Sequence, residues 1–154
     1  MASFERGNIW SKFYCSNAFC ITTNSYIRND GELVMGAGIA LQAKKIFDDL
    51  PLALGRKIKK KCGHLGVYGT LPSNRKEIDK IVAFQVKRHF KNKADLNLIQ
   101  KSASQLSTIA TKYPNKRLDI NFPGIGAGGR DVEEVMPIVK QLPDNVHIWR
   151  FKNE

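Results

Sequence analysis

The chain of 154 residues contains 12 glycines and 42% hydrophobic residues, which suffices for one globular α/β domain over residues 1–154. Its 25 lysines and arginines against 14 acidic residues give a net charge of +11, which favours anionic partners such as a phosphorylated nucleotide or nucleic acid. The N-terminus lacks a signal-peptide core, the longest uncharged run is too short to cross a membrane, and three cysteines without CxxC spacing indicate neither a disulfide framework nor a zinc site. We therefore expect a cytoplasmic protein with no membrane partner, no metal and no resident cofactor.

The first part of the chain combines strand patterns with two helix patterns. Apolar residues recur at helical spacing after Gly38, and Pro51 suits the first turn of a further helix that Gly63 ends. The sequence Asn29-Asp30-Gly31 is a turn or hairpin signal. These patterns predict strands over 4–10 and 18–23, a turn-containing segment over 25–33, and helices over 39–50 and 51–61.

The remaining chain alternates strands and helices. Asp95 is placed to cap a long helix, because a side-chain acceptor is favoured just before the first helical turn. Strands that alternate with helices indicate a mostly parallel sheet with helices on both faces. The patterns predict strands over 65–71, 80–86, 118–122 and 146–151, helices over 95–112 and 132–142, and a loop at 72–75.

Two glycine-rich stretches each connect a strand pattern to a helix pattern. The first is VMGAGIALQAKKIF (34–47) and the second is NFPGIGAGGRD (121–131). Glycines let a backbone approach a ligand closely, and the first turn of a helix offers unpaired N–H groups to anions. Ligands of such folds bind at the carboxyl ends of the strands, so the two stretches predict one cleft that holds a pyrophosphate from two sides. Neither stretch fits the GxGxxG fingerprint or the Walker A sequence.

Four segments of the chain form a recognisable set, namely RGNIW (6–10), CITTN (20–24), VMGAGIALQAKKIF (34–47) and FPGIGAGGRDVEEV (122–135). Together they resemble the macro domain family, whose members bind ADP-ribose. The likeness is closest to the bacterial and viral branch, near the DNA ADP-ribosyl glycohydrolases and the terminal ADP-ribose glycohydrolases. It implies a three-layer α/β/α fold around a mixed, mostly parallel sheet, and binding of ADP-ribose or a related NAD-derived nucleotide between the two glycine-rich stretches.

The resemblance also implies roles for individual residues. Asn8 matches an Asp that accepts from the adenine amino group, and its amide oxygen can accept without charge assistance. Asn24 matches an Asn that faces the distal ribose, whereas Trp10 and Trp149 are expected in the core. The expected ligand-binding residues are Asn8, Ile9, Asn24, Met35, Gly36, Ala37, Gly38, Ile39, Ala40, Phe122, Pro123, Gly124, Ile125, Gly126, Ala127, Gly128 and Gly129.

The residues expected to support hydrolysis differ from those of the related enzymes. Those enzymes place a catalytic Lys just after the strand that we expect over 65–71, where this chain has Leu71-Pro72-Ser73. The terminal glycohydrolases carry a catalytic Asp inside the second loop, where the alignment puts Gly128. If the chain is a hydrolase of ADP-ribosyl linkages or of ADP-ribose 1″-phosphate, the candidate catalytic residues are Asn24 and Asp131. The simpler role for Asp131 is to cap the following helix, and we favour it over catalysis.

The basic residues support an alternative from a different class. RKIKKK (56–61) and the segment 87–93 could follow a nucleic-acid backbone, as a weak electrostatic contact or as the main activity of a nucleic-acid-binding module. Lys87 also follows a strand end and could face the cleft. We place ADP-ribose binding without fast turnover first, hydrolysis second and nucleic-acid binding third.

Overall fold

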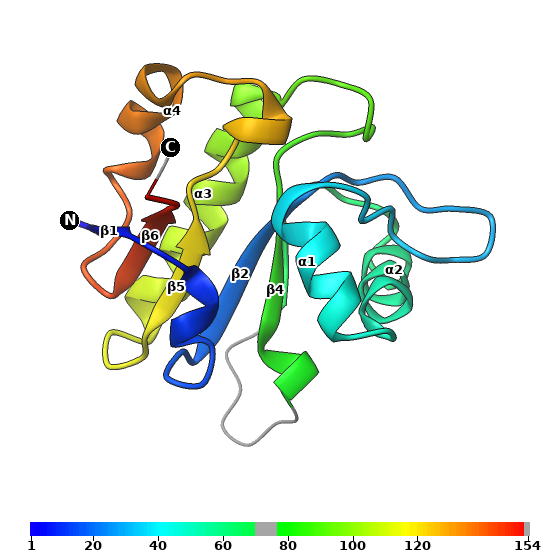
Figure 1. The fold of residues 1–154 in the computed structure, drawn as a ribbon, viewed down its shortest axis with the longest axis horizontal. Coiled ribbons are helices and arrows are strands. Elements are labelled where there is room, and N and C mark those ends of the chain that lie inside the picture. The colour runs from blue at the N-terminus through cyan, green and yellow to red at the C-terminus, as the bar shows by residue number, and fades with distance from the viewer. Residues whose placement is uncertain (70–76, 153–154) are drawn as a thin grey trace.

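The computed structural model describes residues 1–69 and 77–152, and over these residues six strands form one sheet in the order β1-β6-β5-β2-β4-β3 (Figure 1). Neighbouring strands are parallel except for β3, which runs antiparallel to β4 at one edge. The sheet is therefore mixed and mostly parallel, as expected. The strands are β1 (Ser3–Arg6), β2 (Ala18–Thr23), β3 (Val67–Tyr68), β4 (Ile81–Gln85), β5 (Leu118–Asn121) and β6 (Val146–Arg150).

Helices cover both faces of the sheet. Residues alternate along β2, so Phe19 and Ile21 join the core beneath α1 and α2, while Cys20 joins the core beneath α3 and α4. Figure 1 shows these two helix pairs on opposite sides of the strands. This arrangement is the three-layer α/β/α fold. The helices are α1 (Gly38–Ile46), α2 (Leu50–Lys60), α3 (Leu96–Lys112) and α4 (Val132–Val139), and short 3₁₀ turns are η1 (Ile9–Lys12), η2 (Glu77–Lys80) and η3 (Gly126–Gly128).

Polar residues at element ends explain several boundaries. Asp95 caps α3, since its carboxylate accepts from the N–H groups of Asn97 at 2.9 Å and Leu98 at 3.3 Å, which confirms its predicted role. The predicted strand over 4–10 was too long. It ends at Arg6 because the Asn8 side chain accepts from the N–H of Trp10 at 3.0 Å and begins the turn η1.

Further elements differ from the prediction. The helix expected over 39–50 ends at Ile46, because the backbone of Phe47 turns to the extended region, and Pro51 lies in the first turn of the separate helix α2. The helix expected over 132–142 ends at Val139. The turn-containing segment over 25–33 pairs at one bridge, between Ile27 and Leu33. The strand expected over 65–71 covers two residues in β3, and its end at residues 70–71, with the loop expected at 72–75, lies outside the described residues. None of the helices in the described ranges combines the length and apolarity that crossing a bilayer needs.

Candidate functional site

A cavity of about 400 Å³ opens at the carboxyl edge of the parallel strands. Residues at or just after the ends of β1, β2, β4, β5 and β6 line it together with both glycine-rich loops. This is the edge at which α/β proteins bind ligands, because loops from neighbouring parallel strands converge there. The lining residues are Gly7, Ile9, Thr22, Thr23, Asn24, Val34, Gly36, Ala37, Gly38, Ile39, Ala40, Val86, Lys87, Phe90, Asn121, Phe122, Gly124, Ile125, Gly126, Ala127, Gly128, Trp149, Arg150 and Phe151.

Asn24 fixes the connection from β2 to the first glycine loop. Its side-chain amide donates to the carbonyl of Val34 at 2.9 Å, and its carbonyl oxygen accepts from the N–H of Tyr26 at 2.9 Å. The residue is 7% exposed and lines the cavity. Because an amide has two N–H donors and two lone pairs, Asn24 can hold the loop and still offer a hydrogen bond to a ligand hydroxyl.

The first glycine loop, Gly36–Gly38, opens directly into α1. A Cβ placed on Gly36 or Gly38 would meet no atom within 4 Å among the described residues, so space lies beside both glycines. Ala37 is the N-cap residue of α1 and has no side-chain oxygen, and no acidic residue stands in the first turn. The N–H groups at this helix terminus are therefore available to an anion in the cavity.

The second glycine loop, Gly124–Gly129, is packed more tightly. A Cβ on Gly124 would lie 2.7 Å from Cδ1 of Ile99, and one on Gly128 would lie 3.2 Å from Cβ of Ala94. A Cβ on Gly126, by contrast, would meet no described atom within 4 Å. The loop thus presses against α3 and the segment before it, while its tip faces the cavity.

Backbone hydrogen bonds hold the second loop in this shape. The N–H of Ala94 donates to Gly128 at 2.8 Å, and the N–H of Arg130 donates to Gly124 at 2.8 Å. The Arg130 side chain adds a further bond, because its Nε donates to the Ala94 carbonyl at 2.7 Å. These bonds hold the loop in its shape without a ligand, and a preformed loop lowers the entropy cost of binding.

Lys87 is a cavity residue that the expected ligand set did not include. It follows β4 by two positions, and its ammonium donates to the carbonyls of Phe90 at 3.2 Å and Ala127 at 3.4 Å. Partial burial lowers the pKa of this ammonium below the usual lysine value. A catalytic Lys was expected to be missing because of Leu71-Pro72-Ser73, which lie outside the described residues. Lys87, which follows β4, supplies an amine to the cavity instead.

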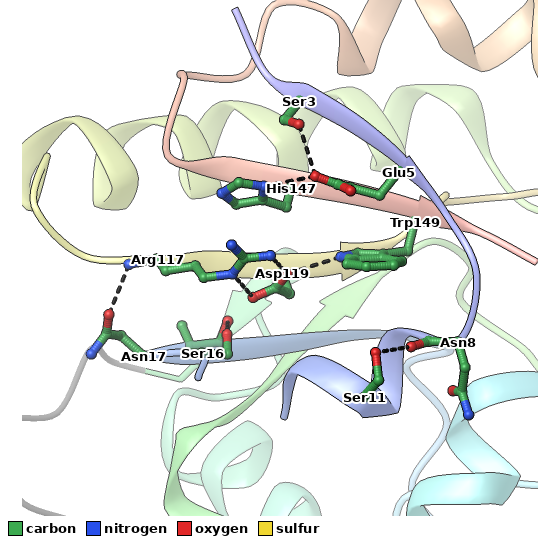
Figure 2. Close-up of polar contacts among 11 residues, drawn as sticks. Ser3, Glu5, Asn8, Ser11, Ser16, Asn17, Arg117, Asp119, His147 and Trp149 are labelled. Carbon is green, nitrogen blue, oxygen red and sulfur yellow. Dashed lines mark hydrogen bonds and ion pairs between the residues drawn. The ribbon is translucent and has the colours of Figure 1, made fainter. Parts of the chain in front are cut away.

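Strands β5 and β6 bring aromatic residues into the cavity lining. Trp149 is 6% exposed and lines the cavity, so the prediction that it belongs only to the core was incomplete. Its indole N–H donates to the buried carboxylate of Asp119 at 2.9 Å (Figure 2). The Arg150 guanidinium carbon lies 5.8 Å from the ring centroid of Phe122. Flat apolar surfaces of this kind suit a nucleobase.

Most of the expected ligand-binding residues line the cavity. Asn8 lies outside the lining, since its side chain is exposed and caps η1. Asp131 is also exposed and outside the lining, at the N-cap of α4, where its backbone N–H donates to Glu134 at 2.9 Å. Met35, Pro123 and Gly129 flank lining residues. Those that line the cavity are Ile9, Asn24, Gly36, Ala37, Gly38, Ile39, Ala40, Phe122, Gly124, Ile125, Gly126, Ala127 and Gly128.

The lining residues outside the expected ligand-binding list have one feature in common. Most of them lie at the carboxyl ends of strands. Thr23 is the most informative, since it is 3% exposed and its hydroxyl has no hydrogen-bond partner within the described residues. A buried hydroxyl without a partner is costly unless a ligand or water pairs with it. The unexpected lining residues are Gly7, Thr22, Thr23, Val34, Val86, Lys87, Phe90, Asn121, Trp149, Arg150 and Phe151.

No family model and no curated protein sequence matches this chain. Solved structures do match it along its length. They include the DarTG protein of Thermosipho africanus in complex with ADP-ribose (TM-score 0.78, 20% identity, 100% of this chain and 43% of that chain) and the macrodomain of Thermus aquaticus DarG (TM-score 0.72, 24% identity, 99% of this chain and 98% of that chain). The macrodomain of Mycobacterium tuberculosis DarG is also similar (TM-score 0.69, 24% identity, 97% of each chain). The chain spans less than half of the Thermosipho protein, and its fold is that of the macrodomains.

Proposed function

We propose that this macrodomain-fold chain binds ADP-ribose or a closely related NAD-derived nucleotide in the cavity between its two glycine loops. The observation that carries the proposal is the uncapped N-terminus of α1, which faces the cavity beside the open space at Gly36 and Gly38. Backbone N–H groups at a helix terminus favour a phosphate without a charged side chain. The Thermosipho DarTG structure, which shares the fold, was solved with ADP-ribose.

The cavity lining offers a partner for each part of such a ligand. Trp149 and Phe122 offer apolar surface to a base, and Asn24 offers an amide to a ribose hydroxyl. The two glycine loops border the same cavity and offer backbone N–H groups to a diphosphate. The volume of about 400 Å³ falls within the range of small-molecule sites.

Calorimetric titration tests this proposal directly. We expect heat on adding ADP-ribose, weaker binding of AMP and NAD, and little response to free adenosine, which lacks phosphate. No heat with ADP-ribose at tens of micromolar protein would contradict the proposed function. If adenosine binds as tightly as ADP-ribose, the helix terminus does not have the role assigned to it.

A second candidate function is hydrolysis of an ADP-ribosyl linkage, and Lys87 favours it. A lysine amine whose pKa is lowered by burial is a better nucleophile at neutral pH than an exposed lysine. In this mechanism the neutral amine attacks the anomeric carbon of the distal ribose, and the bond from that carbon to the modified group breaks with its electron pair. The nitrogen gives up one proton, and the leaving group takes one up. The ribosyl-lysine then opens to an imine, which water hydrolyses to ADP-ribose and free lysine. Asn24 stays a candidate for orienting the ribose, whereas the position of Asp131 gives no support to a catalytic role.

The hydrolysis proposal is tested with ADP-ribosylated DNA, ADP-ribosylated protein and ADP-ribose 1″-phosphate as substrates. We expect Lys87→Ala to lose turnover, and Lys91→Ala, which removes an exposed lysine outside the cavity lining, to keep it. The wild-type rate should rise with pH as the amine loses its proton, at a lower pH than for an unperturbed lysine. Borohydride should trap a Lys87 adduct. Full turnover by the Lys87→Ala variant would exclude this mechanism.

A loose contact with nucleic acid is a further proposal, based on the net charge of +11 and the exposed basic end of α2 at Arg56, Lys59 and Lys60. Contacts of this kind weaken with salt at a slope of about −0.9 per neutralised phosphate, so binding should fade between roughly 50 and 200 mM salt. ADP-ribose binding should change less, because N–H contacts in a cavity are poorly screened. Nucleic-acid binding that persists at high salt and resists competition by ADP-ribose would make nucleic acid the main ligand. The cytoplasmic location stays a prediction.

A further inference from the structure

A fully buried carboxylate, that of Asp119, is hydrogen-bonded to the cavity residue Trp149. Asp119 in β5 is 0% exposed and accepts three hydrogen bonds (Figure 2). Arg117 donates two of them, through Nε to Oδ2 and through Nη2 to Oδ1, each at 3.0 Å, and the indole N–H of Trp149 donates the third to Oδ1 at 2.9 Å. The two partners come from opposite directions, and Trp149 is the one that lines the cavity.

The burial of Asp119 is expensive for a role in stability alone. Removing a carboxylate from water carries a large free-energy cost, and a buried ion pair often stabilises a protein no more than apolar residues of similar size do. Strand β5 places its other buried residues, Leu118 and Ile120, in the apolar core. A role in holding a neighbouring side chain in place therefore explains the burial of Asp119 better than a role in stability does.

Trp149 is fixed on two sides by this arrangement. Asp119 binds the nitrogen edge of its indole. On another edge lies Gly7, where a Cβ would stand 3.7 Å from Cζ3 of the ring. Gly7 itself is held by a hydrogen bond from its N–H to the carbonyl of Arg150 at 2.9 Å. Asp119 and Gly7 thus lie at two edges of the ring and limit how the indole can turn.

We propose that Asp119 is a positioning residue for base recognition: it holds the indole of Trp149 in the orientation that forms the wall against which the nucleobase lies. This inference rests on the proposed function. Without the carboxylate, the indole N–H would lose its buried acceptor, and the ring would turn toward another acceptor or toward water. The base would then lose a fixed flat surface, while the phosphate contacts of the glycine loops would remain.

The prediction concerns base-dependent affinity, measured as the ratio of the dissociation constants of ribose 5-phosphate and AMP. Asp119→Ala should lower this ratio about fivefold to tenfold, because an ordered aromatic contact with the base is weakened. Trp149→Phe, which keeps a ring and removes the N–H donor, should lower it in the same direction. The Asp119→Ala/Trp149→Phe double variant should lose no more than the larger single effect, because both changes break one contact.

Arg117→Ala is the matched control. It removes the ion pair and destabilises the chain as Asp119→Ala does, but it leaves the bond between Asp119 and Trp149 in place. We expect the ratio to stay at the wild-type value in this variant. If Asp119→Ala does not fold, Trp149→Phe and Asp119→Asn, which retains an acceptor for the indole, supply the same comparison.

The outcomes separate this inference from the function on which it rests. A wild-type chain that binds no ADP-ribose overturns the proposed function. A wild-type chain that binds ADP-ribose, with an unchanged ratio in Trp149→Phe and Asp119→Ala, overturns only the role of Asp119. An equal fall of the ratio in Arg117→Ala and Asp119→Ala also overturns the role of Asp119. The fall would then follow from lower stability rather than from the lost contact with the indole.

Discussion

The first glycine loop opens onto the cavity, whereas the second is packed between the cavity and α3. Added methyl groups at Gly36 and Gly38 would enter open space, but at Gly124 and Gly128 they would meet Ile99 and Ala94. Glycine therefore serves ligand access in one loop and, at two of its positions, close packing in the other. A glycine-rich pattern alone does not distinguish these reasons, and they predict different consequences of substitution.

The helices that follow the two loops differ in the same way. α1 begins without a side-chain cap, whereas α4 begins with Asp131 and carries Glu133 and Glu134 in its first turn. Acidic side chains at a helix N-terminus occupy its N–H groups and repel anions. The diphosphate is therefore expected to use the helix terminus of the first loop and the backbone tip of the second.

The largest effect is expected for Gly36→Glu. The backbone of Gly36 is outside the left-handed region, so a side chain can be added without strain, and it would place bulk and negative charge beside the phosphate path. ADP-ribose binding should weaken about 100-fold or more, with the unfolding temperature unchanged. The Gly36→Gln variant adds similar bulk without the charge, so its affinity shows how much of the loss is steric. Wild-type affinity in Gly36→Glu would show that the first loop does not border the ligand. Gly38→Glu and Gly126→Glu should also abolish binding, with added strain because both glycines have positive φ.

Gly124→Ala should act on stability instead. Its φ of +82° and the 2.7 Å approach to Ile99 predict a free energy of unfolding lower by about 2 kcal/mol, measured by chemical denaturation. Gly126→Ala is the control, because its φ of +64° brings strain without a neighbouring atom, and it should cost about 1 kcal/mol. Equal losses in the two variants would contradict the packing role assigned to Gly124.

Asp131→Ala should have a smaller effect. Loss of the N-cap residue of α4 is expected to lower the free energy of unfolding by about 1 kcal/mol. ADP-ribose binding and any turnover should stay at wild-type values, since Asp131 is exposed and outside the cavity lining. Loss of turnover with intact folding would restore Asp131 as a catalytic residue.

The smallest effect concerns acid sensitivity. The hydrogen bond from the Asp131 N–H, followed by the charges of Arg130 and Lys93, lowers the pKa of Glu134. Its contribution to stability is therefore present above the unfolded pKa and is lost as pH falls through the lower folded value. Glu134→Gln should remove this part of the pH dependence in denaturation curves. If the loss of stability at acidic pH is the same in Glu134→Gln as in the wild type, the hydrogen bond from the Asp131 N–H to Glu134 does not contribute as proposed.

The sequence predicted the layers and the two loops because both depend on local signals. The alternation in β2, the Asp95 cap and the glycines can be recognised without knowing the strand order. Lys87 and Trp149 were harder to assign, because their places in the cavity follow from the order in which the strands lie in the sheet. Asn8 shows a different limit of sequence reasoning. Its short polar side chain bonds the neighbouring backbone and lies outside the cavity lining, so its role toward a ligand stays a prediction.

The pairing of β1 with β6 has a consequence for how the cavity forms. Ser3 lies opposite His147 in this pair, and Gly7 and Phe151 beyond the strand ends both line the cavity. Trp149 and its neighbours therefore join the cavity lining only once β6 has paired with β1, although the first glycine loop lies about a hundred residues earlier in the sequence. Closing so long a loop is slow, and this step is expected to come late in folding. A ligand that requires the whole lining would bind only after this step and would not assist earlier folding.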